Sequence, residues 1–322
     1  MRERNHADHG PPEAMNGHST EGTPMVSVVV PTYGRLPLLR EAIASVVRQT
    51  FGDWELIVAD DGSTDGTHEY LETIDDPRVR PIRLEHGGIT SARSAGLAHA
   101  RGKWVAFLDS DDLWLPGKLA LQLRRLAARP ACRWSYTGYS LIDTKGAPLP
   151  ERSKLLPRPV SGNILEPVLR FEISTPVQTM LARRSLIEEI GGFDQTIPFL
   201  SDYDFAVRLA ARSEACALPE ILTLIREHAG RASSNLRDAD LYADQEHSFR
   251  KAASAATSRK LRVLCLRQCA VQLARQAAAL SREGSHGAAF AALARAIGTT
   301  PFRRAIWRAA AGCVVRALGG FA

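Results

Sequence analysis

The chain has 322 residues, 45% hydrophobic and 24% charged, with a formal net charge of +6 at pH 7, an ordinary composition for a protein with a sizeable core. No apolar run approaches the roughly 18 residues of a membrane-spanning helix, which excludes that class. The five cysteines form no CxxC pair, which argues against a disulfide framework or structural zinc site and suits a reducing cytoplasm.

Residues 1–24 are polar, rich in Gly, Pro and His, and without the apolar stretch of a secretory signal, so they predict a disordered leader. Four short apolar runs predict strands over residues 26–30, 55–59, 79–84 and 103–108. Helical segments alternate with them, among them a small-residue helix over residues 90–100. This alternation predicts an α/β fold: a mostly parallel, Rossmann-like central sheet flanked by helices.

The chain from residue 114 to 224 is less regular. It predicts helices over residues 117–128 and 202–211, strands over 133–142 and 174–181, and a Pro-rich loop over 145–160. Beyond residue 237 the pattern is helical throughout, with breaks near Gly284 and at residues 300–301. We therefore expect three parts: the leader 1–24, an α/β domain 25–236 and an all-helical C-terminal extension 237–322.

Polar clusters follow three of the predicted strands: Thr32 and Tyr33, then Asp60 and Asp61, then the run from 109 to 112, which contains three aspartates. Parallel strands bring their carboxyl ends to one edge of the sheet, where ligands of such folds bind. Five aspartates in one crevice repel one another, and the simplest partner is a hard divalent cation, Mg²⁺ or Mn²⁺. The alternative is that several of them only cap helices or turns.

The motifs VSVVVPTYGR, ELIVADDGSTDGT, ARSAGL and GKWVAFLDSDDLWLPGKL occur in this order over residues 25 to about 235. This set resembles the catalytic domain of glycosyltransferase family 2, inverting enzymes of GT-A fold. The resemblance implies sugar transfer from a nucleoside diphosphate sugar, with a UDP-sugar expected, to a hydroxyl of a glycan or lipid-linked glycan. It also implies assistance by Mn²⁺ or Mg²⁺, and a place in cell-envelope polysaccharide biosynthesis.

The resemblance assigns a donor site. Thr32 and Asp61 would hold the nucleotide base, and Tyr33 would pack against its ring or serve packing alone. Arg93, in the family's RN pair, would contact the diphosphate. Asp109 would contact the ribose or a metal-bound water.

It also assigns the metal and the base. Asp111 would ligate the metal, and His228, in a stretch that resembles an RxH motif, is a second candidate ligand because a neutral imidazole suits Mn²⁺. Asp202 aligns with the catalytic base that takes the acceptor proton. Its alternative role is to cap the helix that follows. Ser201 stands where the family has Glu, a departure at the acceptor side.

Two rival functions differ in class. A non-catalytic nucleotide-sugar-binding or scaffolding protein is motivated by Ser201 and by the long basic tail. A sugar-phosphate nucleotidylyltransferase shares the crevice and the metal, but it would show a Gly-rich basic phosphate loop where PTYGRLP stands.

The basic charge lies at the C-terminal end. Residues 250–322 hold 13 Lys and Arg and one acid, whereas residues 1–249 hold 28 basic and 34 acidic residues. One interpretation is a basic amphipathic surface on an anionic membrane, which would make a cytoplasmic protein peripheral to the inner membrane face. The other is packing on the domain or a partner, with Arg on the solvated outer face. In the last segment, the apolar residues Ile306, Ala309, Cys313, Val314, Ala317 and Leu318 are predicted to share a face. Nucleic-acid binding is not expected, since the tail has few aromatic residues.

Overall fold

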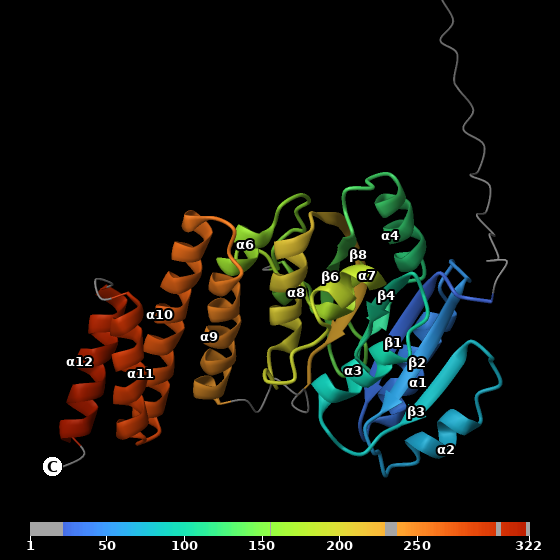
Figure 1. The fold of residues 1–322 in the computed structure, drawn as a ribbon. Helices are drawn as coiled ribbons and strands as arrows, with labels where there is room; N and C mark the ends of the chain where they lie inside the picture. The colour runs from blue at the N-terminus through green and yellow to red at the C-terminus, as the bar shows by residue number, and fades with distance from the viewer. Residues whose placement is uncertain (1–21, 155, 229–236, 301–303, 320–322) are drawn as a thin grey trace, which may run out of the picture.

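The computed structural model describes residues 22–154, 156–228, 237–300 and 304–319 (Figure 1). Most of the predicted leader, residues 1–21, lies outside these ranges. The described residues form an eight-stranded sheet with helices on both faces, followed by four helices that lie side by side at one end of the molecule. The α/β class and the helical C-terminal segment are thus as predicted.

The sheet has the strand order β3-β2-β1-β4-β7-β6-β8-β5. Its strands are β1 (Val26–Thr32), β2 (Trp54–Asp60), β3 (Val79–Arg83), β4 (Trp104–Phe107), β5 (Leu113–Trp114), β6 (Trp134–Ile142), β7 (Met180–Arg183) and β8 (Ala215–Arg226). The first four pair in parallel, β7 is antiparallel to both β4 and β6, β6 pairs in parallel with β8, and β5 is antiparallel to β8. The sheet is therefore mixed, and its parallel half carries the predicted aspartate loops.

Strand β1 is buried along its whole length because helices cover both of its faces. Val28 and Val30 belong to the core that includes residues of α1 (Leu36–Val47), α2 (Thr67–Glu72) and α4 (Lys118–Ala127). Val29 belongs to the opposite core. The elements on that side include α3 (Ile89–Ala98), α6 (Leu165–Leu169), α7 (Arg184–Glu189) and α8 (Ser201–Arg212).

A close approach between α3 and β1 fixes the position of the crevice wall. A Cβ at Gly96 would stand 2.4 Å from Val29 Cγ1, so the missing side chain lets α3 lie directly against the strand. Arg93 lies one turn earlier on the same helix and is buried at the end of β1 and β4. Helix packing thus delivers this cation to the carboxyl edge of the sheet.

The strand predicted over residues 174–181 is wrong over residues 174–179. Residues Val177–Thr179 form a 3₁₀ turn, η1, and only then does β7 begin. Tertiary hydrogen bonds hold the turn: Trp114 Nε1 donates to the Gln178 carbonyl at 2.9 Å, and Gln122 Nε2 donates to the Thr179 carbonyl at 3.0 Å. The predicted Pro-rich loop contains a short helix, α5 (Pro150–Ser153), and the 12-residue strand β8 was not predicted.

The C-terminal extension consists of α9 (Asp238–Ser254), α10 (Arg259–Arg282), α11 (His286–Thr299) and α12 (Arg304–Gly319). Predicted breaks near Gly284 and residue 300 are present, and a further break separates α9 from α10. Phe249 of α9 is buried against Tyr203 and Phe171, and Asp244 accepts hydrogen bonds from the amides of residues 199 and 200. Within the described ranges, every helix is too short or too polar to cross a membrane.

Candidate active site

A crevice of about 420 Å³ opens at the carboxyl ends of β1, β2 and β4. Most of the residues singled out from the sequence line it together: Thr32, Tyr33, Asp61, Arg93, Asp109, Asp111, Asp112 and Asp202. The remaining predicted ligand, His228, lies beside them, with Nε2 3.1 Å from Asp111 Oδ2. Side chains from segments up to about 200 residues apart therefore converge on one site.

The acidic run after β4 is surrounded by donors. Arg93 Nη2 donates to Asp109 Oδ1 at 2.7 Å, and Arg35 Nη1 donates to Asp111 Oδ2, the oxygen that also faces His228. Gln178 Nε2 donates to Asp109 Oδ2 at 2.6 Å and to the third aspartate, residue 112, at 2.8 Å. These contacts offset the mutual repulsion of the carboxylates.

Asp112 faces inward, toward the protein. Its Oδ1 accepts the backbone N–H of Arg226 at 2.8 Å, and its Oδ2 accepts from Gln178. The Arg226 guanidinium is itself buried, donating to the Asp111 carbonyl at 3.0 Å and to Glu41 Oε2 at 2.6 Å. Arg226 therefore joins the aspartate turn to α1 and to the end of β8, two residues before His228.

Four residues of the site were not predicted from the sequence: Gln178, Arg226, Arg35 and His86. Arg226 stands in the IREH stretch, and Arg35 in PTYGR, so both motifs contained a signal. The sequence around Gln178 contains no such signal, because only the η1 turn brings this side chain to the site.

The chemistry of this donor set fits a divalent cation. Oxygens of Asp109, Asp111 and Asp112 lie within 4.8 Å of one another, and hard cations such as Mg²⁺ and Mn²⁺ take carboxylate oxygens. The imidazole next to Asp111 adds a nitrogen that Mn²⁺ accepts. Gln178 Oε1 is buried without a hydrogen-bond partner among the described residues, which fits a site that receives a further polar group.

Asp61 anchors the loop between β3 and α3. Its Oδ1 and Oδ2 accept the amides of Gly87 and Gly88, each at 2.9 Å, and His86 Nδ1 lies 2.9 Å from Oδ2. Tyr33, half of whose surface is exposed, stacks on His86 with ring centroids 4.2 Å apart and an interplanar angle of 24°. The Thr32 hydroxyl nearby is buried and, within the described ranges, has no partner. A flat aromatic platform thus borders a carboxylate and an unpaired hydroxyl.

Asp202 lies in the first turn of α8, at the crevice rim, rather than at the cap position that its alternative role required. The cap residue is Leu200, and Asp202 Oδ1 accepts the next amide, of Tyr203, at 2.8 Å. Burial raises the pKa of Asp202; Arg93 opposes the rise, and the charge of Asp109 adds to it. A carboxylate with a raised pKa is suited to accept a proton. Ser201, buried beside it, accepts a hydrogen bond from Thr90 Oγ1 at 3.0 Å, which ties α8 to α3.

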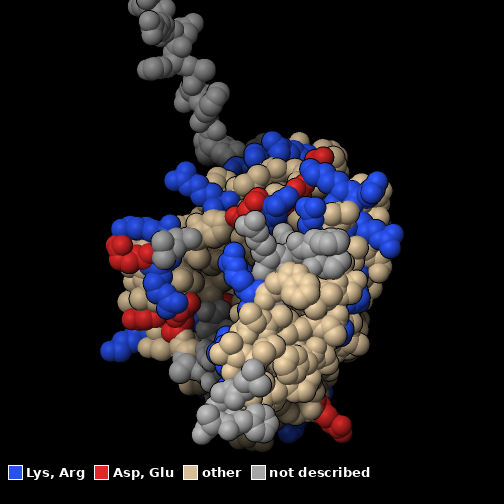
Figure 2. Space-filling model, turned by 90° about the vertical axis from the view of Figure 1, so that its left-hand side faces the viewer, with Lys and Arg blue, Asp and Glu red and all other residues tan. Residues whose placement is uncertain are grey.

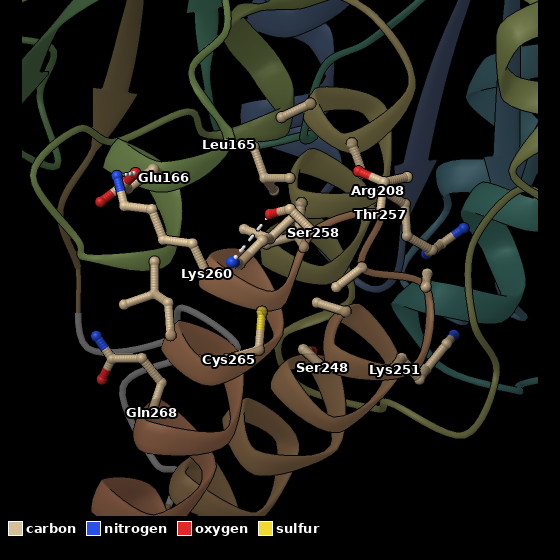
Figure 3. Close-up of a pocket in the computed structure, with 18 of the residues that line it drawn as sticks. Leu165, Glu166, Arg208, Ser248, Lys251, Thr257, Ser258, Lys260, Cys265 and Gln268 are labelled. Atoms are coloured by element: carbon tan, nitrogen blue, oxygen red, sulfur yellow. Dashed lines mark hydrogen bonds and ion pairs between the residues drawn. The ribbon is translucent and has the colours of Figure 1, made fainter.

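A larger cavity, of about 890 Å³, lies near the other end of α8, where the turn between α9 and α10 meets α6 (Figure 3). The close-up shows Lys260 reaching to Glu166, 3.3 Å apart, and Ser258 capping α10 through the amide of Leu261. These contacts connect the extension to the α/β domain. The acidic triad and Asp202 lie elsewhere, so the smaller crevice is the candidate active site.

Comparisons with known proteins agree with this geometry. The Glycosyl transferase family 2 model matches residues 27–191. A Rickettsia prowazekii (strain Madrid E) uncharacterized glycosyltransferase, RP339, is 30% identical over 235 residues, which cover 71% of this chain and 72% of that protein. The Escherichia coli UDP-Glc:alpha-D-GlcNAc-diphosphoundecaprenol beta-1,3-glucosyltransferase WfgD is 34% identical over 120 residues, 37% of this chain and 47% of that protein.

A third relative, from Bacillus subtilis (strain 168), is named for teichuronic acid biosynthesis and is 41% identical over 133 residues, 40% of this chain and 52% of its own. The chain thus spans about half the length of several curated relatives. Among solved structures, Staphylococcus aureus TarS 1–349 in complex with UDP-GlcNAc superimposes with a TM-score of 0.69 at 18% identity, covering 90% of this chain and 88% of that one. That likeness concerns the fold. By the family model and the aligned relatives, the chain belongs to glycosyl transferase family 2.

Proposed function

We propose that this chain transfers a sugar from a nucleoside diphosphate sugar to an acceptor hydroxyl, with inversion at the anomeric carbon. One observation carries the proposal: a single crevice holds an aromatic platform beside Asp61, an acidic cluster beside Arg93, and the half-buried carboxyl of Asp202. These features match, in order, a base, a diphosphate and an attacking hydroxyl. A UDP-sugar is the expected donor, a choice supported by the UDP-GlcNAc complex of TarS and by the UDP-Glc named for WfgD.

In the proposed reaction the acceptor oxygen attacks the anomeric carbon from the face opposite the diphosphate. Asp202 takes the hydroxyl proton, the new C–O bond forms, and the bond to the diphosphate oxygen breaks. Asp111 and His228 would hold Mn²⁺ or Mg²⁺, which, when bound, offsets the charge of the leaving diphosphate. Arg93, positioned by Asp109, contributes positive charge at the same place.

For the acceptor we propose a hydroxyl of a glycan or lipid-linked glycan in cell-envelope polysaccharide biosynthesis. The name of WfgD specifies a diphosphoundecaprenol-linked sugar, and the B. subtilis relative is named for a wall polymer. Such an acceptor would make the chain a peripheral protein at the cytoplasmic membrane face. We propose that residues 25–236 form the catalytic domain and residues 237–322 the helical extension. Phe249, Cys265 and Cys269 of the extension share the core of the α/β domain, whereas α11 and α12 pack with α10 in a separate core.

The non-catalytic alternative rests on Ser201 and on the long basic tail. The Ser201 hydroxyl accepts a hydrogen bond from Thr90 Oγ1, so this side chain links α8 to α3. A serine cannot supply the acidic side chain that the family pattern has at this position. The retained carboxylate of Asp202 favours catalysis.

The test is thermal shift with UDP-, GDP- and dTDP-sugars, with and without Mn²⁺, followed by donor hydrolysis and transfer assays. At least one donor should stabilise the protein only with the metal, and Asp111→Ala should abolish that shift. Asp202→Asn should keep the shift and lose turnover, which separates binding from chemistry. If every donor leaves the melting temperature unchanged with Mn²⁺ present, the proposed donor site is refuted.

A further inference from the structure

Helix α12 is apolar on two sides, and only one of them is buried. Cys313 packs, together with Ala309 and Ala310, into the core shared with α10 and α11, and its Sγ reaches the Ala277 carbonyl at 3.5 Å. The sequence predicts that Val314 and Cys313 share a face, but in the structure Val314 is 43% exposed whereas Cys313 is buried. A helix with apolar residues around most of its circumference normally has partners on both sides.

The outward side continues onto α11. We call it the end face and define it by four exposed side chains: Phe290, Trp307, Val314 and Val315. Trp307 is 54% exposed and Val315 69%. Of the 11 large hydrophobic residues exposed in the described chain, these four share two neighbouring helices, whereas single exposed residues are scattered on ordinary surfaces. Figure 2 shows a broad uncharged area at this end of the molecule.

The two helices that carry the end face, α11 and α12, bear basic but no acidic side chains. Residues 286–319 contain five arginines and not a single Asp or Glu. Arg308 and Arg316 are exposed on α12, and Figure 2 shows Lys and Arg above the uncharged area and along its sides. Arg295 and Arg282 pair with acids of α9, yet each keeps 55% of its side chain exposed. An apolar centre with a cationic margin fits an anionic partner.

Two partners could bury apolar side chains here, and the charge distinguishes them. A second copy of this chain, related by a two-fold axis, would bring the arginines of α12 together, and α11 and α12 carry no acids to meet them. An anionic lipid surface instead supplies phosphates to the arginines and an apolar layer to the side chains between them. Tryptophan is also the side chain most typical of the membrane interface.

We propose that the end face docks the protein on an anionic lipid surface. Trp307, Val314 and Val315 enter the boundary between headgroups and acyl chains, and the surrounding arginines contact lipid phosphates. The biological role of this docking rests on the proposed function, because a lipid-linked acceptor would lie at the membrane surface to which the protein binds. The docking itself depends only on the surface.

The experiment is co-sedimentation of the full chain with vesicles of phosphatidylcholine alone and of phosphatidylcholine mixed with phosphatidylglycerol. The wild type should sediment with the mixed vesicles, bind them less as salt rises, and stay in the supernatant when the vesicles are neutral. Val315→Asp should weaken binding about tenfold or more, since burying one such side chain contributes at least the free energy of a tenfold change. Val263→Asp is the matched control: the same change at an exposed valine of α10, away from the end face, should leave binding unchanged.

Equal binding by Val315→Asp and wild type would overturn the proposal, as would equal binding to neutral and anionic vesicles. A dimer in light scattering that Val315→Asp dissociates would assign the end face to a second copy instead. Unchanged melting temperatures of both variants exclude unfolding as the cause. The donor thermal shift keeps the two proposals apart, because a wild type that fails to bind the anionic vesicles but keeps its donor shift refutes the docking alone.

Discussion

Gln178 Nε2 donates to Asp109 Oδ2 at 2.6 Å, across 69 positions of sequence, and the same nitrogen reaches Asp112 Oδ2 at 2.8 Å. One neutral amide thus stands between two carboxylates that would otherwise face each other. The η1 turn aims the amide, and hydrogen bonds from Trp114 Nε1 and from the Thr223 hydroxyl to the Gln178 carbonyl hold the turn. The arrangement keeps the acidic cluster ordered by protein contacts.

In Gln178→Leu, the carboxylates of Asp109 and Asp112 should therefore repel each other without an amide between them. Hydrogen bonds to charged groups contribute more than neutral ones, so we expect the free energy of unfolding to fall by about 2 kcal/mol. Adding Asp112→Asn should restore about 1 kcal/mol of it, because the second charge is gone while Asn can still accept from the Arg226 amide. Urea unfolding of both single variants and the double variant measures this coupling, and strictly additive effects would contradict it.

The pH dependence of transfer should follow Asp202. Its pKa is raised by burial, against the opposing charge of Arg93. Since the base must be ionised, kcat/KM should fall as pH drops through this raised pKa, and the acid limb should lie above the ordinary value of about 4. Arg93→Met removes the opposing charge, so the limb should move to higher pH, whatever the loss in rate. A limb that stays in place in this variant would show that another group titrates.

Asp61 should serve both folding and donor binding. Asp61→Ala leaves the amides of Gly87 and Gly88 without their acceptor, so we expect the free energy of unfolding to fall by about 2 kcal/mol. We also expect the donor-induced thermal shift to be lost. Asp143→Ala is the control. That carboxylate also accepts two loop amides, of residues 145 and 147, but outside the crevice, so the donor shift should persist. Equal donor shifts in the two variants would remove Asp61 from the donor site.

Lys118 predicts a pH effect on stability. It is fully buried, with Nζ 2.8 Å from Gln122 Oε1 and 4.1 Å from the Trp114 ring centroid, and burial lowers its pKa well below the ordinary value. Between the lowered pKa and about 10.4, the unfolded chain holds a proton that the folded chain releases more readily, so stability rises with pH across that window. Lys118→Met should lack this contribution, and its free energy of unfolding should approach that of the wild type, or fall below it, as pH rises from neutral to about 9. Stability curves that run parallel for the two proteins would contradict this direction.

The sequence by itself determined the parallel half of the sheet and most of the crevice, but not Arg35, His86 or Gln178, which also line it. The apolar runs over residues 26–30, 55–59 and 103–108 are local patterns, and parallel pairing necessarily brings their ends to one edge. Asp202 was also placed from sequence, although its position inside the first turn of α8 was not.

Only the tertiary structure decided the rest, because the deciding contacts join distant segments. Residues 174–181 favour a strand locally, yet hydrogen bonds from Trp114 and Gln122 stabilise a turn there and bring Gln178 to the aspartates. Helix α12 is the same case: apolar residues surround most of it, so periodicity could not separate Cys313 from Val314. Packing against α10 and α11 buried one side and left the other facing solvent.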